Sequence, residues 1–151
     1  MKRLSFQPLD RSLKILILAG ALPLALIVAL YEGTVGGAVA ALIIALLPLG
    51  IAFLSGTTIA TDGSRIAVGF RPFYRKRFPV SETTEVDVVS VRAFEDFGGW
   101  GIKGKASGKG LLLSSGGEQV VEFTLSDGRR YLVSSQDPEA VKEQLTHLLP
   151  R

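Results

Sequence analysis

Residues Ile15–Tyr31 (ILILAGALPLALIVALY) and Val35–Leu54 (VGGAVAALIIALLPLGIAFL) are two apolar stretches without a charged residue, separated only by Glu32, Gly33 and Thr34. At about 1.5 Å per residue, a helix over the second stretch is about 30 Å long and one over the first about 25 Å. A helix bonds its own backbone amides, which lipid cannot do for it. We therefore predict a transmembrane helical hairpin over residues 15–55.

Small side chains recur every four residues in both stretches. Folding the chain antiparallel about Gly33 sets one row of small residues opposite the other. Such rows let helix backbones approach closely, and close packing stabilises helix pairs in lipid. The predicted packing positions are Ala21, Ala25 and Ala29 on the first helix and Gly37, Ala41 and Ala45 on the second.

The distribution of basic residues predicts the topology. The segment before the first stretch is basic, the connecting turn has no Lys or Arg, and a second basic group follows the hairpin. The positive-inside bias then puts both termini in the cytoplasm of a two-pass protein of the cell membrane. A cleaved signal peptide is the rival interpretation, but the first apolar run exceeds the usual length and a second follows at once. Residues 1–14 are thus expected to be a cytoplasmic segment and 56–151 a single cytoplasmic domain.

Composition limits the classes of function. The chain of 151 residues is 47% hydrophobic, and the excess is concentrated in the hairpin. The absence of cysteine excludes disulfides and thiolate metal sites. The net charge of +3 does not predict nucleic-acid binding, because basic residues beside membrane spans already have a topological explanation.

After Thr57 the hydrophobic pattern changes to the alternation of β-strands. Two strands around Asp62-Gly63 are predicted to form a hairpin with a type I′ turn that pairs Ile59 with Ile66 and Thr57 with Val68. Further strands are predicted over residues 73–78, 85–94, 100–103 and 111–114.

The C-terminal part predicts one more hairpin and a helix. Residues 119–125 and 129–135 flank Ser126-Asp127-Gly128, and a three-residue loop with Gly128 in the left-handed position pairs Phe123 with Tyr131 and Val121 with Val133. Asp137 then suits an N-cap and Pro138 a first helical position. Val141, Leu145, Leu148 and Leu149 give this helix an apolar face. The expected fold is a small antiparallel β-barrel or sandwich capped by the helix.

Several segments resemble those of bacterial pleckstrin-homology-like (PH-like) domains of small membrane proteins. They are residues 66–78 (IAVGFRPFYRKRF), 79–88 (PVSETTEVDV), 97–103 (FGGWGIK) and 121–136 (VEFTLSDGRRYLVSSQ). The resemblance implies a seven-stranded, strongly bent barrel capped by the C-terminal helix, and no catalytic residue. Eukaryotic relatives bind phosphoinositides through a basic loop after the first strand. The corresponding loop here, Thr61–Ser64, is short and contains an acid, so this property does not transfer.

Two sets of residues are candidates for contact with lipid or a partner. The first is basic, and its members could bind an anionic headgroup or an acidic partner, although a solvated strand face and loop explain them as well. Alternation along a strand sends only every second charge to the same side. The second candidate is a single residue, Trp100. It is either an exposed contact residue or part of the core, beside a bend that the neighbouring glycines allow. The basic candidates are Arg71, Arg75, Lys76, Arg77, Lys103, Lys105 and Lys109.

No catalytic, cofactor or metal site is predicted. Gly99–Gly104 matches the G-x-G-x-x-G string of dinucleotide sites, but no helical pattern follows it. The only histidine, His147, falls at the end of the C-terminal helix. The leading hypothesis is a membrane-anchored, non-catalytic binding or scaffolding module for another protein, acting through a sheet edge or the glycine-rich loop. The alternative is a sensor of anionic lipid headgroups, and the sequence does not predict an oligomeric state.

Overall fold

The computed structural model describes residues 1–104 and 110–149, and the chain divides into two compact units. One unit is helical and comprises Leu9–Ser55. The other is a β unit that combines Met1–Pro8 with the chain from Gly56 onwards. The helical unit is thus inserted between the first strand of the β unit and the rest of it.

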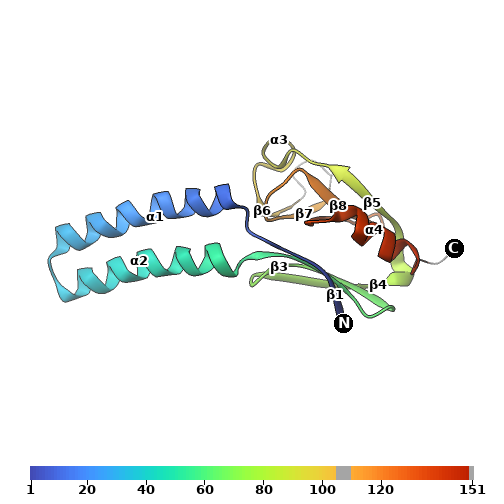
Figure 1. Ribbon diagram of the computed structural model, residues 1–151, viewed down its shortest axis with the longest axis horizontal. Coiled ribbons are helices and arrows are strands. Elements are labelled where there is room, and N and C mark those ends of the chain that lie inside the picture. Colours follow the sequence, from blue (N-terminus) through green and yellow to red (C-terminus); the bar gives the residue numbers. More distant parts are fainter. Residues whose placement is uncertain (105–109, 150–151) are drawn as a thin grey trace. The chain divides into compact units, whose positions relative to one another are not determined.

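The helical unit is a hairpin of α1 (Arg11–Glu32) and α2 (Val35–Leu54), which pack side by side (Figure 1). Asp10 caps α1 by accepting a hydrogen bond from Ser12 N at 2.8 Å. Gly33, with φ of 54°, ends α1 in the left-handed conformation, and Thr34 Oγ1 then accepts from Gly37 N at 3.0 Å to begin α2. Two consecutive residues, Gly33 and Thr34, therefore form the turn of the predicted hairpin.

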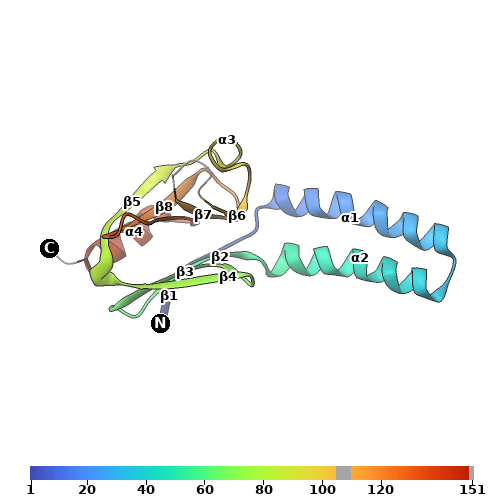
Figure 2. The same ribbon diagram turned by 180° about the vertical axis from the view of Figure 1, so that it is seen from behind.

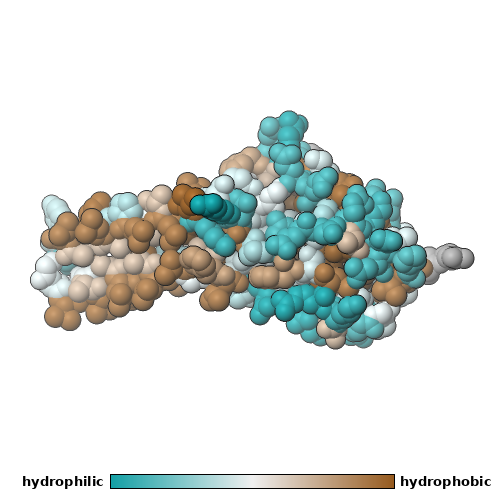
Figure 3. Space-filling model, in the orientation of Figure 1, coloured by the Kyte–Doolittle hydropathy of each residue, from teal (hydrophilic) through white to brown (hydrophobic). Residues whose placement is uncertain are grey.

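Both helices are long and apolar enough to cross a membrane. In each helix, only 11% of the most apolar 18-residue segment is buried. Large side chains such as Leu30 and Leu54 are therefore exposed. Figure 3 shows this apolar surface along the hairpin and a more hydrophilic surface over the β unit. Exposure of so many large apolar side chains is expected of a surface that faces lipid and not water.

The small residues of the hairpin are partly buried. Ala21 and Ala25 of α1 are buried, as are Gly37 and Ala41 of α2. Ala45 is half-buried and Ala29 is exposed. A Cβ atom added to Gly37 would collide with Cβ of Glu32, so the hairpin has no room for a side chain there.

The first sheet of the β unit, sheet A, is antiparallel with the strand order β1-β2-β3-β4. Its strands are β1 (Lys2–Pro8), β2 (Gly56–Thr61), β3 (Arg65–Arg71) and β4 (Tyr74–Pro79) (Figures 1 and 2). Strand β1 was not predicted, because its partner β2 lies beyond the whole helical hairpin in sequence.

The predicted pairing of β2 with β3 is wrong by two residues. Ile59 lies opposite Val68, and Thr61 lies opposite Ile66. The turn begins at Asp62, whose Oδ1 accepts hydrogen bonds from Ser64 N, Ser64 Oγ and Arg65 N. Only Gly63 has a positive φ there, so the turn is not type I′, which requires positive φ at both central residues. A shift of two residues preserves the faces of the strands, and Ile59, Ile66 and Val68 are all buried as predicted.

The second sheet, sheet B, has the order β5-β8-β9-β7-β6. Its β7 and β9 are parallel, so the prediction of a wholly antiparallel domain is wrong at this pairing. The segment 85–94, predicted as one strand, is also wrong at its end, because helix α3 (Ala93–Phe97) follows β5 and ends at left-handed Gly98. The strands are β5 (Thr83–Ser90), β6 (Gly101–Lys103), β7 (Leu111–Ser114), β8 (Gln119–Leu125) and β9 (Arg130–Ser134).

Most of the C-terminal predictions are confirmed. Phe123 pairs with Tyr131 and Val121 with Val133, and Gly128 has a φ of 81°. Helix α4 (Pro138–Thr146) begins where Asp137 Oδ1 accepts from Ala140 N at 3.0 Å. It packs on β5 and β8 and buries Val141 and Leu145. The predicted apolar face is wrong at its end, because α4 stops at Thr146, so Leu148 and Leu149 lie beyond it and Leu148 is exposed.

Aromatic and hydroxyl contacts join the two sheets. The ring of Phe78 on β4 lies 5.8 Å from that of Phe123 and 5.4 Å from that of Tyr131. Thr57 Oγ1 on β2 donates to the carbonyl of Ser134 on β9 at 2.7 Å, and it lies 3.1 Å from Oγ of both Ser115 and Ser134. Ser115 Oγ also donates to the carbonyl of Gln7 on β1. This buried network holds β1 and β2 to sheet B.

Candidate functional site

Sheet A contains no acidic residue. Its four strands carry seven Lys and Arg and no Asp or Glu. The nearest acid in sequence, Asp62, lies in the β2–β3 turn, where the backbone N–H of Arg65 and the hydroxyl of Ser64 lower the pKa of its carboxyl group. Asp62 is thus engaged in its own turn, and the strands keep their positive charge.

Strand alternation places most of this charge on one face. Ile59, Ile66 and Val68 point into the β unit, so the residues between them point to the opposite, outer face of sheet A. On β4, Arg75 and Arg77 share the outer face and Lys76 points to the other side, opposite Val68. The exposed arginines of the outer face are Arg3, Arg65, Arg71, Arg75 and Arg77.

The outer face of sheet A is hollowed in the middle, because the side chains there are small. One row of paired residues across the sheet contains Thr58, Gly69 and Arg75, and the next contains Arg3, Ala60, Ala67 and Arg77. In these two rows the central strands β2 and β3 contribute short side chains, while Arg3 on β1 and Arg75 and Arg77 on β4 contribute long cationic ones, as does Arg71 at the end of β3. The resulting shape is a groove with a small-residue floor and arginine walls.

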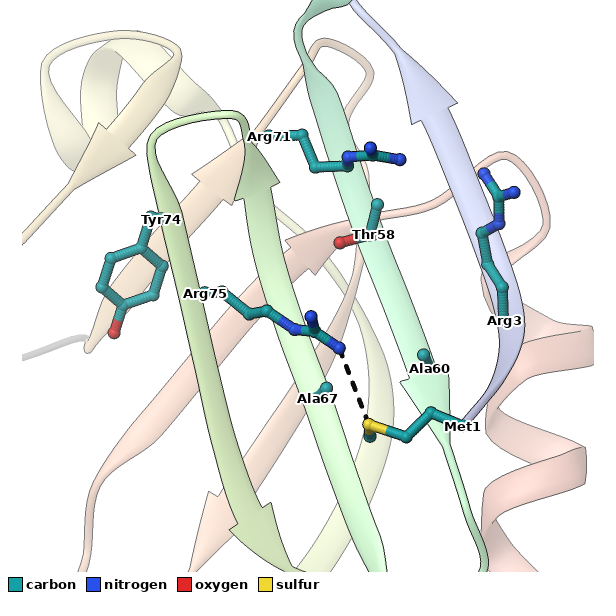
Figure 4. A pocket seen from close by; sticks show the side chains of 8 residues that line it. All are labelled: Met1, Arg3, Thr58, Ala60, Ala67, Arg71, Tyr74 and Arg75. Carbon is teal, nitrogen blue, oxygen red and sulfur yellow. Dashed lines mark hydrogen bonds between the residues drawn. The ribbon is translucent and has the colours of Figure 1, made fainter.

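This arginine groove has a volume of about 340 Å³ (Figure 4). Figure 4 shows the guanidinium groups of Arg3, Arg71 and Arg75 around Thr58, with Ala60 and Ala67 leaving space between the long side chains. The lining residues are Met1, Arg3, Thr58, Ala60, Ala67, Arg71, Tyr74 and Arg75.

The arginines of the groove have few contacts of their own. Arg75 Nη2 lies 3.7 Å from the Met1 sulfur, and the guanidinium carbon of Arg3 lies 5.7 Å from the centre of the Phe6 ring. Within residues 1–104 and 110–149, no carboxylate forms an ion pair with Arg3, Arg71 or Arg75. Their charges are uncompensated in the described part of the chain and can bind an anion.

Tyr74 lies at the edge of the groove, but its ring points away from the arginines, toward the inner face of sheet A (Figure 4). Burial raises the pKa of its hydroxyl, and the neighbouring Tyr131 raises it further. The hydroxyl therefore stays protonated near neutral pH, but it faces sheet B and is not a donor to the groove.

The structure brings some of the predicted contact residues together and separates others. Arg71 and Arg75 share the groove, whereas Lys76 points to the opposite face of sheet A. Lys103 belongs to β6 of sheet B, and Lys105 and Lys109 lie outside the described residues. Arg3 completes the groove. From the sequence it was only one of the basic residues before the first helix that predict the membrane topology, because its place on the sheet depends on strand β1, which was not predicted.

Trp100 packs against the core on one side and against an exposed ring on the other. It is half-buried against the apolar cluster of sheet B that includes Phe97, Leu112 and Leu132. Its other side meets the ring of Phe94, which is 60% exposed, in an edge-on contact with 4.3 Å between ring centres. Trp100 thus fills the core and supports an exposed aromatic side chain.

The glycine string and the histidine occupy structural positions. Gly101–Lys103 forms strand β6, so the string is not the strand–turn–helix of a dinucleotide site. His147 is the C-cap residue of α4. Among the described residues, no three His, Cys, Asp or Glu side chains are grouped closely enough to hold a metal ion.

Comparison of the chain with protein-family models, with curated proteins and with solved structures finds no match. The function is therefore inferred from the hairpin and the arginine groove themselves.

Proposed function

We propose that this protein is a membrane-anchored, non-catalytic binding module. The helical hairpin spans the cell membrane twice, and the β unit and both termini lie in the cytoplasm. The exposed apolar surface of α1 and α2 and the absence of Lys and Arg from the connecting turn support this arrangement. The β unit is a PH-like domain, a proposal that the C-terminal helix on sheet B supports, although the described chain has nine strands and not seven.

The outer face of sheet A binds the anionic headgroups of the bilayer in which the hairpin is anchored. The observation that carries this proposal is the acid-free sheet with five arginines exposed on one face. A basic residue near an anionic membrane surface contributes about 1 kcal/mol of attraction. Several such residues on one face give an attraction that orients a tethered domain.

Chain connectivity supports the same function. Only Leu9 and Asp10 separate β1 from α1, and only Ser55 separates α2 from β2. With 3.8 Å between successive Cα atoms, the end of β1 lies at most about 11 Å from the start of α1. Leu9 N donates to the Ser55 carbonyl at 3.2 Å, which holds the two connections together. Two strands of sheet A are thus tethered directly to the membrane-spanning helices.

Arginine modification tests this function in the full chain. The protein is reconstituted in nanodiscs of phosphatidylcholine with or without phosphatidylglycerol, treated with phenylglyoxal and analysed by peptide mass spectrometry. We expect Arg3, Arg71 and Arg75 to react several times more slowly when the anionic lipid is present, and high salt to abolish the protection. Arg92 on the sheet B side is exposed and serves as the internal control. Equal rates for Arg75 in the two lipids would refute the proposal.

A second candidate function is the binding of another protein through the aromatic pair Phe94 and Trp100. The exposed ring of Phe94, rigidly supported by Trp100, has the character of an interface anchor. A photo-crosslinker at position 94 in native membranes should give one discrete adduct that a crosslinker at Ser126 does not give. The absence of any adduct specific to position 94 would remove this candidate.

A further inference from the structure

The arginine groove has three cationic walls around one small-residue floor, an arrangement suited to one compact anion more than to a diffuse charged surface. We propose that the groove binds a phosphate monoester, with Arg3, Arg71 and Arg75 as its cationic ligands. This inference rests on the proposed function, because it specifies the headgroup chemistry that the same face recognises. A lipid that ends in a phosphate monoester is the membrane-bound form of this ligand.

The donor set distinguishes a monoester from a diester. A guanidinium group presents parallel N–H donors that match pairs of phosphate oxygens. A monoester has three terminal oxygens and, with its second pKa near 6, a charge of about −1.5 to −2 at neutral pH. A phosphodiester has two non-bridging oxygens and one charge. Three separate guanidinium groups therefore complement a monoester better.

The dimensions of the sheet allow Arg3, Arg71 and Arg75 to contact one phosphate group together. Strands lie about 4.8 Å apart, so Arg3 on β1 is about 14 Å from its row partner Arg77 on β4 and about 16 Å from Arg75, two residues along β4, at the backbone. Arginine side chains are long enough to approach one phosphate group from both sides of this separation. Arg71 adds a third guanidinium group from β3 (Figure 4).

Next to the floor of the groove, Gly69 leaves no room for a side chain between β2 and β4. A Cβ atom added there would lie 2.7 Å from the Tyr74 carbonyl oxygen and 3.2 Å from Thr58 Oγ1. Thr58 Oγ1 has no hydrogen bond to any residue that the structure describes, so its hydroxyl can donate to a phosphate oxygen. The floor thus supplies space and a neutral donor where the walls supply charge.

Calorimetric titration of the full chain in uncharged detergent micelles tests the inference. The probes are the short-chain lipids dihexanoyl phosphatidic acid, a monoester, and dihexanoyl phosphatidylglycerol, a diester. We expect the monoester to bind at least tenfold more tightly. Arg71→Gln and Arg75→Gln should each weaken its binding at least fivefold. Arg65→Gln, which removes the same charge from the same face outside the groove, should change it less than twofold. Unchanged Trp100 fluorescence verifies that each variant is folded.

The outcomes separate this inference from the proposed function. Equal affinity for the two lipids, with Arg65→Gln as harmful as Arg75→Gln, would overturn the monoester inference and leave binding to an anionic surface intact. No binding of either lipid, together with equal arginine modification in the two nanodiscs, would overturn both. A third probe, glycerol 3-phosphate, carries the same monoester without acyl chains. If it binds as tightly as phosphatidic acid, the monoester chemistry is supported and the ligand is a soluble one.

Discussion

Asp87 on β5 and Lys142 on α4 form an ion pair, with 2.7 Å between Oδ1 and Nζ, that ties the C-terminal helix to sheet B. The hydrogen bond from Lys142 lowers the pKa of Asp87 below its ordinary value of 3.8, and the same bond raises the pKa of Lys142. A carboxyl group whose pKa is lowered by folding stabilises the folded state above its unfolded pKa. That stabilisation is lost as the pH falls through the lowered folded pKa.

We therefore predict that Asp87→Asn reduces the stability of the β unit at pH 7, and that this effect disappears as the pH falls through the lowered folded pKa of Asp87, below which the wild-type carboxyl is also neutral. Urea unfolding in detergent, followed by the fluorescence of the single tryptophan, Trp100, measures this. In a Lys142→Met background the effect of Asp87→Asn should largely disappear. An equal effect with and without Lys142 would show that the ion pair is not its cause.

Gly37 determines how closely the two ends of the hairpin turn approach each other. Gly37→Ala should weaken the hairpin, because the new Cβ atom would collide with Glu32. Gly36→Ala is the matched control, since its Cβ atom would meet only Thr34 Oγ1, at 3.7 Å. Both changes raise helix propensity by about 1 kcal/mol, so their difference isolates the collision. Titration with SDS in mixed micelles should give a lower unfolding midpoint for Gly37→Ala than for Gly36→Ala, and equal midpoints would contradict the packing.

The hydroxyl network of Thr57 joins β2 to β9 and, through Ser115, to β1. Thr57→Val would leave its buried partners without this donor and acceptor, which typically costs about 1–3 kcal/mol. Thr58→Val makes the same chemical change on the outer face of the same strand and should alter the free energy of unfolding by less than about 0.5 kcal/mol. Urea unfolding followed by Trp100 fluorescence compares the two, and an equal loss for both would contradict a specific role of the network.

Among the helices and strands, the sequence predicts those whose start, end or pairing is determined by neighbouring residues. Asp137 and Pro138 mark the start of α4, and the left-handed Gly128 defines the register of β8 with β9. Strand β1 could not be predicted in this way. Its sequence, KRLSFQP, lacks clear alternation, and its pairing with β2 depends on the two connections that the hairpin brings together. The groove was missed for the same reason, since Arg3 reaches it only through β1. The parallel pairing of β7 with β9 likewise depends on the arrangement of the whole sheet.

At the scale of the β unit, charge is segregated along the chain. Eleven of the 14 acidic residues of the protein follow Pro79, the last residue of sheet A, and none lies in a strand of sheet A. An anionic surface attracts one sheet and repels the segments that follow it. In the proposed function, this asymmetry would give the tethered domain a preferred face toward the membrane, within the Debye length of about 8 Å at physiological salt.

The placement of the β unit on the cytoplasmic side of a two-pass anchor is the claim on which this account depends. Because the chain contains no cysteine, single cysteines can be introduced and labelled without background. Glu32→Cys reports on the turn between the helices, and Ser126→Cys reports on the β8–β9 turn. With a membrane-impermeant maleimide, we predict that position 32 is labelled in intact cells and position 126 only after the membrane is permeabilised. Labelling of position 126 in intact cells, or of both positions from the same side, would contradict the account.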